Sequence, residues 1–173
     1  MEKEKIRIAF NEIKGFLDKH FLENYNESEE YEECYHINVY SQNAEDSSVW
    51  FEFDIENSEL IVGYGISHIH YGEQYGKEIK EGINRLLDFF SVKMRRTDYF
   101  KGETIFKNIY EIKKENGEYE YFGTSSMFLI YPFWKKSFWG ETTKKVTEQS
   151  ELIINEKTKA ELEKIRERIN NVC

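Results

Sequence analysis

The sequence predicts an α+β fold: an antiparallel sheet of about six strands with helices mainly on one face, in the order α-βββ-α-βββ-α. Three observations support this prediction. Apolar residues recur at three- and four-residue steps in three segments, which is typical of amphipathic helices. Between these segments, apolar and polar residues alternate, as they do in half-buried strands. Short turns rich in Asn, Gly and Ser separate the strands, which favours antiparallel pairing of neighbours.

The first half of the chain is predicted to form one helix and three strands. In the helix over 3–22, an apolar stripe runs from Ile6 to Phe21. Residues 23–33 are polar and acidic, and we expect them to form an irregular connection. The strands are expected at 34–41, 48–55 and 59–66. Alternation is clearest at 48–55, where Val49, Phe51, Phe53 and Ile55 alternate with Trp50, Glu52 and Asp54.

The second half repeats this arrangement. A helix is predicted over 74–90, with a buried stripe that begins at Tyr75 and ends at Phe90. The strands that follow are expected at 92–100, 103–114 and 118–131. Asn116 and Gly117 form a hairpin signal between the last two of these strands. The tail is helical, with Leu162, Ile165 and Ile169 on one stripe and with Thr158 and Glu161 spaced as a capping box.

Length and composition indicate a single domain over residues 1–173. The chain contains 13 Phe, 12 Tyr and 3 Trp, enough aromatic area for a packed core. Two cysteines form neither a disulfide framework nor a zinc pattern. The N-terminus lacks an apolar signal core, and the longest apolar run, 127–134, is far below the roughly 20 residues that cross a bilayer. We therefore expect a cytoplasmic protein with no membrane partner.

The net charge limits the choice of partners. The chain carries 24 Lys and Arg against 33 Asp and Glu, a net charge of −9. Such a protein repels phosphate backbones, so nucleic acid is not an expected partner. A basic protein is a better candidate, because opposite charges steer association. The alternative is that the negative charge serves only solubility. The oligomeric state does not follow from the sequence.

The stretch GYGISHIHYGEQYGK, residues 63–77, contains two histidines one residue apart. In a strand, His68 and His70 point to the same face, and neutral imidazoles suit zinc and related metals. A metal site needs a third ligand, for which Glu73 is near in sequence. Ligands from other strands are also conceivable: His36, Asp54 and Asp98. No spacing among these residues requires a metal, and we expect no cofactor.

Two other interpretations of His68 and His70 remain open. In the first, the strand ends at Ser67, either Ser67 or the histidines bond to exposed backbone groups, and His70 or Tyr71 packs under the start of the helix. Gly72 would give the backbone the freedom that this turn needs. In the second, the two histidines belong to a surface that faces a partner.

Other catalytic patterns have little support. Cys34 and His36 share a strand face, but a Cys–His dyad needs a third orienting group, and a buried structural cysteine is the simpler interpretation. Glu52 and Asp54 are spaced as a glycosidase pair would be on a strand, yet a solvated outer face explains them equally well. No Gly-x-Ser-x-Gly elbow occurs, and the GYG of 63–65 does not continue into a phosphate-binding loop.

Two segments carry the features of a binding surface. In the acidic connection, Tyr25 and Tyr31 are interleaved with carboxylates that include Glu29 and Glu30. Tyrosine rings supply contact area and carboxylates supply steering toward a basic protein. The second segment, MFLIYPFWKKSFWG at 127–140, has six aromatic residues. Those beyond its proline either cover the end of the core or form an exposed docking patch.

A strand that runs into HIHYG before an amphipathic helix, in a small acidic chain with aromatic strands, resembles the immunity proteins of bacterial polymorphic-toxin loci and related uncharacterised proteins of Firmicutes. The matching residues are His68, His70 and Tyr71, within about 60–90. The resemblance implies a non-enzymatic intracellular protein that binds and blocks a cognate toxin. The acidic charge would suit a basic toxin, such as a nuclease. The alternative is a small metal-dependent hydrolase that uses His68 and His70.

Overall fold

The computed structural model describes residues 2–40, 48–114, 116–126, 142–149 and 156–172. In this part of the chain, three helices and two antiparallel sheets follow one another in the order α-βββββ-α-ββββ-α. The predicted α+β class is therefore confirmed. The prediction of a single sheet of about six strands is wrong, because the strands divide into a sheet of five and a sheet of four.

The first sheet is an antiparallel meander in which every strand pairs with its neighbour in sequence. Its strands are β1 (Tyr25–Tyr31), β2 (Cys34–Tyr40), β3 (Ser48–Asp54), β4 (Glu59–Tyr64) and β5 (Ser67–Tyr71). Alternate residues of the three central strands are fully buried, among them Ile37, Phe51 and Leu60. This period-two burial gives the sheet one face that lies against the core and one that does not.

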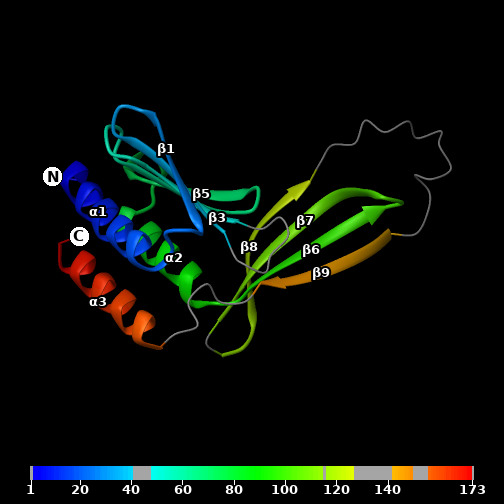
Figure 1. Ribbon diagram of the computed structural model, residues 1–173. Helices are drawn as coiled ribbons and strands as arrows, with labels where there is room; N and C mark the ends of the chain where they lie inside the picture. The colour runs from blue at the N-terminus through cyan, green and yellow to red at the C-terminus, as the bar shows by residue number, and fades with distance from the viewer. Residues whose placement is uncertain (1, 41–47, 115, 127–141, 150–155, 173) are drawn as a thin grey trace.

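The second sheet has the strand order β8-β7-β6-β9. Its strands are β6 (Met94–Lys101), β7 (Thr104–Lys113), β8 (Tyr119–Ser126) and β9 (Thr142–Gln149). Figure 1 shows that this sheet extends away from the helices as an arm. Only its base joins the core, where the ring of Tyr110 lies 5.2 Å from that of Tyr64, centre to centre.

The helices are α1 (Glu2–His20), α2 (Ile79–Ser91) and α3 (Glu156–Val172), and they gather on one side of the first sheet (Figure 1). Their apolar stripes pack on the inner face of that sheet and on one another. Phe10 of α1 lies edge-on to Phe53 of β3, at 5.6 Å between ring centres, and Phe16 contacts Phe90 of α2 at 6.0 Å. Each such ring contributes about 1.5–3 kcal/mol through burial. None of the described helices is long and apolar enough to span a membrane.

Three strands were missed or misplaced by sequence reasoning. β1 lies in the segment predicted to be irregular, 23–33, and its burial pattern explains the error. Six of its seven residues are exposed, so no alternation marks it, and backbone pairing with β2 holds it in place. β9 is also largely exposed and lay outside every predicted element. β5 continues from Ser67, where the strand before it was expected to end.

The helix boundaries also differ from the prediction. Residues 73–75 form a short 3-10 helix, η1 (Glu73–Tyr75), which ends at Gly76 in the left-handed region with φ 64°. This turn delays α2 until Ile79, so Tyr75 is 45% exposed and is not part of a buried stripe. At the C-terminal end, α3 begins at Glu156, which places Thr158 inside the helix and not at its cap. The aromatic stretch 127–140 lies outside the described residues.

Candidate binding surface

The outer face of the first sheet is the face opposite the helices. Because successive strand residues point to opposite sides, the neighbours of the buried core residues point outward here. The outward residues of the four strands β2 to β5 include His36, Asn38, Trp50, Glu52, Glu59, Ile61, Gly63, His68 and His70. The helices of the described chain lie on the other side of the sheet (Figure 1). Three of the four histidines in the protein therefore lie on one face of the sheet, opposite the described helices (Figure 1).

Five rings form a continuous line across this face, which we call the histidine–tryptophan row: His36, Trp50, His68, His70 and Tyr75. Successive ring centres are 5.4, 5.4, 5.1 and 4.9 Å apart. The row starts on β2, crosses β3 and β5, and ends on η1. It brings together residues that are up to 39 positions apart in the chain.

A glycine on β4 allows the row to cross the sheet. In the strand register, Gly63 lies between Trp50 of β3 and His68 of β5. The indole of Trp50 lies over Gly63, so that a Cβ atom there would meet Nε1 at 2.5 Å and Cζ2 at 2.6 Å. The indole Nε1 donates a hydrogen bond of 2.7 Å to the carbonyl of Gly65. The missing side chain at position 63 thus lets Trp50 contact a histidine two strands away.

Two carboxylates hold the imidazoles of the row. Glu59 Oε1 lies 2.5 Å from Nδ1 of His70, and the Glu59 side chain is only 13% exposed. Glu52 Oε2 lies 3.6 Å from Nδ1 of His36. Both carboxylates come from the strands that neighbour the histidines in the sheet. Glu59 fixes the orientation of the His70 ring through a hydrogen bond, whereas Glu52 lies near His36 without one; both carboxylates make the row partly negative, a combination suited to polar recognition.

The two histidines that the sequence singled out lie on the same face of β5, as their spacing predicts. Glu73 does not join them, because it lies on η1 and lines a separate hollow. Asp98 lies on the second sheet. Among the described residues, no group of three or more His, Cys, Asp or Glu side chains could hold a metal ion. Tyr71 packs against α2 at Gly82, in agreement with the interpretation that places this segment under the helix.

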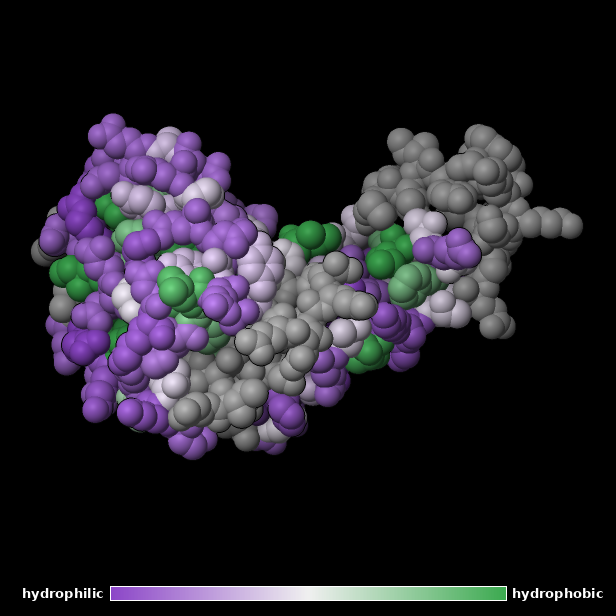
Figure 2. Space-filling model, viewed as in Figure 1, coloured by the Kyte–Doolittle hydropathy of each residue, from purple (hydrophilic) through white to green (hydrophobic). Residues whose placement is uncertain are grey.

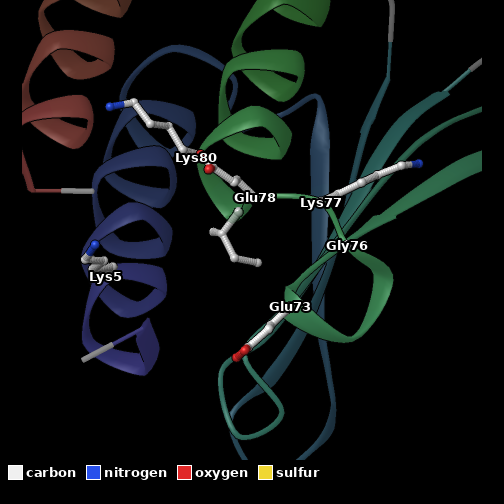
Figure 3. A pocket seen from close by; sticks show the side chains of 7 residues that line it. Lys5, Glu73, Gly76, Lys77, Glu78 and Lys80 are labelled. Atoms are coloured by element: carbon white, nitrogen blue, oxygen red, sulfur yellow. The ribbon is translucent and has the colours of Figure 1, made fainter.

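The hollow beside η1 has a volume of about 430 Å³. It is lined by Lys5, Glu73, Gly76, Lys77, Glu78, Ile79 and Lys80. Figure 3 shows that Lys77 and Lys80 extend in opposite directions, and that Lys5 lies on a different helix. The ammonium groups of these lysines do not converge on one point, so the hollow does not have the geometry of an anion-binding site.

The acidic residues predicted to bind a partner lie on β1, the edge strand of the same sheet. Glu29 and Glu30 are exposed, and each accepts one local hydrogen bond, from the Glu33 backbone and the Ser28 hydroxyl respectively. The ring of Tyr25 packs against the core and its hydroxyl donates to Asp18 of α1. Burial, followed by this hydrogen bond, raises the pKa of Tyr25 to about 12. Of the two tyrosines, Tyr25 is therefore mainly structural.

Tyr31 is 51% exposed, and its hydroxyl donates to Asp54. The Asp54 side chain is buried, which corrects the expectation that Glu52 and Asp54 share a solvated face. Cys34 is buried beside them, and burial raises the pKa of its thiol to about 11. A thiol in that state is protonated at neutral pH and is not an activated nucleophile. This is the structural cysteine that the sequence favoured.

Sequence reasoning missed Trp50, Tyr75 and Gly63 as parts of a surface. One signal was present: Trp50 falls on the polar side of an alternating strand, where a large aromatic residue is unusual. The face that Figure 2 presents is mostly hydrophilic, with small separate hydrophobic patches. No known family model, curated protein or solved structure matches this chain.

Proposed function

We propose that this protein is a non-enzymatic cytoplasmic binding protein, of the immunity type, that inhibits a cognate basic toxin. The observation that supports the proposal most directly is the histidine–tryptophan row on the outer face of the first sheet. Trp and Tyr side chains are enriched among the residues that dominate binding energy in protein interfaces. The paired strands of the sheet give them a rigid base, so little side-chain entropy is lost when a partner docks.

Exposed apolar residues border the same face. The described residues expose seven large hydrophobic side chains: Tyr75 belongs to the row itself, and Tyr31, Tyr40 and Ile66 lie on strands or a turn of the same sheet. Tyr40 is held by a hydrogen bond of 2.9 Å from Asn26 of β1. This exposed aromatic and apolar area beside the imidazoles has the composition of a protein interface more than that of an ordinary solvated sheet face.

The charge distribution favours a basic partner. Residues 1–91, which include the first sheet and two helices, contain 20 acidic and 8 basic side chains. The four strands of the second sheet contain 4 acidic and 7 basic side chains. The negative field is therefore centred on the body that presents the outer face. Such a field steers a positively charged partner toward the acidic edge at β1.

Binding to the product of the gene immediately upstream tests this proposal. The expected result is a tight complex with a basic polypeptide, weakened at least about tenfold by Tyr75→Ala, because exposed Tyr anchors often contribute more than 1 kcal/mol. Tyr121→Ala is the matched control, since Tyr121 is 59% exposed on the second sheet. Absence of any complex, or equal weakening by both variants, would contradict the proposed function of the outer face.

A second measurement addresses the acidic edge. The double variant Glu29→Lys with Glu30→Lys should lower the association rate constant by about tenfold at low salt, with a smaller effect at high salt. The control carries the same charge change on α3, at the exposed residues Glu163 and Glu167. If the two double variants slow association equally, then net charge alone steers the partner and β1 has no special part.

A further inference from the structure

His68 and His70 have the geometry of a pair of metal ligands. They occupy positions i and i+2 of β5, so both rings project from the outer face. Their ring centres are 5.1 Å apart. Two imidazoles bound to one tetrahedral ion at about 2.0–2.1 Å from nitrogen to metal place their ring centres roughly 5 Å apart. The two rings meet edge to face, with 65° between their planes, and their separation lies within the span that one shared ion can bridge.

Glu59 prepares His70 for this role. The carboxylate lies 2.5 Å from Nδ1 of His70 and can accept its proton in a hydrogen bond. In a neutral imidazole, this leaves the lone pair on Nε2, at the other side of the ring. Metal-binding histidines usually have such a carboxylate on their second nitrogen, which fixes the ring and makes the ligand more basic. Gln74 Nε2 lies 3.4 Å from the other oxygen of Glu59 and helps to hold it.

We propose that His68 and His70 bind one exchangeable transition-metal ion of the zinc or copper class, with Glu59 as the positioning residue. A structural or catalytic site would need a third protein ligand, which the described residues do not supply; a two-histidine site instead leaves the remaining positions of the ion to water. This arrangement suits an ion that exchanges, because closed four-ligand sites are the ones that hold zinc structurally. The inference does not depend on the proposed binding function, since it concerns the two histidines alone.

Titration of the full chain with ZnCl₂ in a calorimeter tests the site. One ion should bind per chain, and His68→Ala and His70→Ala should each weaken binding by about tenfold or more. His20→Ala is a matched control, because His20 lies on α1 with its Nε2 3.1 Å from Glu161. His36→Ala is a second control, because the Trp50 ring separates His36 from His68. Both controls should bind zinc as the native chain does.

Copper gives a second readout that locates the ion. The ring centre of Trp50 is 5.4 Å from that of His68. Cu²⁺ bound at the site should therefore quench the fluorescence of the Trp50 indole, and Trp50→Phe should remove most of the quenching. Glu59→Ala should weaken zinc binding several-fold, whereas Glu59→Gln, which keeps an acceptor oxygen, should restore part of it. Zinc binding that is absent, or that is unchanged in both His68→Ala and His70→Ala, would overturn the assignment. Thermal unfolding of each variant shows whether it is folded.

Discussion

Replacing Gly63 with Ala is the sharpest structural test of the histidine–tryptophan row. The added methyl would lie 2.5 Å from Nε1 and 2.6 Å from Cζ2 of Trp50, much closer than atoms can approach without repulsion. The β4 backbone is paired on both sides, with β3 and β5, and cannot yield easily. The indole must therefore leave its place over β4. It would lose its hydrogen bond to Gly65 and its contact with His68.

The magnitude follows from these losses. Forcing extra volume into a packed position costs about 1–3 kcal/mol, and the lost hydrogen bond costs about 1 kcal/mol. Replacing a glycine also restricts the unfolded chain, which offsets about 0.4–1 kcal/mol of this cost. The expected net loss of unfolding free energy for Gly63→Ala is about 1–3 kcal/mol. For a chain of 173 residues, this corresponds to a fall in Tm of roughly 2–12 °C.

Urea unfolding measures the effect, and a double-mutant cycle assigns it to the indole. In a Trp50→Ala background, the same glycine replacement should cost little, because the ring that it strikes is gone. Gly15→Ala is the control. Gly15 lies in α1, and no atom there would come within 4 Å of an added methyl, so this change should stabilise the fold by about 0.5–1 kcal/mol. A Gly63→Ala protein as stable as the native chain, or additive costs in the cycle, would refute the reasoning.

Two further predictions concern the groups around Tyr31. Burial alone would raise the pKa of Asp54, but hydrogen bonds from Asn57 and Tyr31 outweigh it and hold that pKa below its usual value. The carboxylate therefore stabilises the fold above about pH 4 and loses this effect as pH falls through the lowered pKa. Tyr31→Phe should lower the free energy of unfolding by about 1 kcal/mol at pH 7. It should also make that free energy, measured by urea unfolding at several pH values, fall less steeply below about pH 4; an unchanged fall would contradict this. In a Cys173→Ser background, a thiol reagent should modify Cys34 slowly in the native protein and quickly in urea; equal rates would contradict its burial.

The fold could be predicted where burial of one face of an element produces a regular spacing of apolar residues in the sequence. The helix at α1 and the strand at β3 were located to within about two residues, because each has one fully buried face. β1 and β9 could not be found in this way. Both are exposed strands at the edges of their sheets, and backbone pairing, which has no residue signature, defines them. The division into two sheets could not be predicted either, because it too depends on which strands pair through their backbones.

Only part of the candidate surface could be predicted from the sequence. The spacing of His68 and His70 is local, so the shared face of β5 followed from strand geometry alone. The approach of Trp50 to His68 depends on the register of three strands and on a glycine at one position of the middle strand. A single sequence does not determine which residues become neighbours across a sheet. The row therefore became visible only when the strand register was known.

The two groups of residues that the sequence associated with binding lie at opposite edges of one sheet. Glu29 and Glu30 are on β1, whereas His68 and His70 are on β5. Four strand spacings of about 4.8 Å separate these edges, roughly 19 Å in all. A standard protein interface covers about 800 Å² on each partner, which corresponds to a patch roughly 30 Å across. One partner of this size can thus reach from the row to the edge strand β1, where Glu29 is paired with Tyr35 on the side that faces α1, and variants at either edge should weaken the same complex.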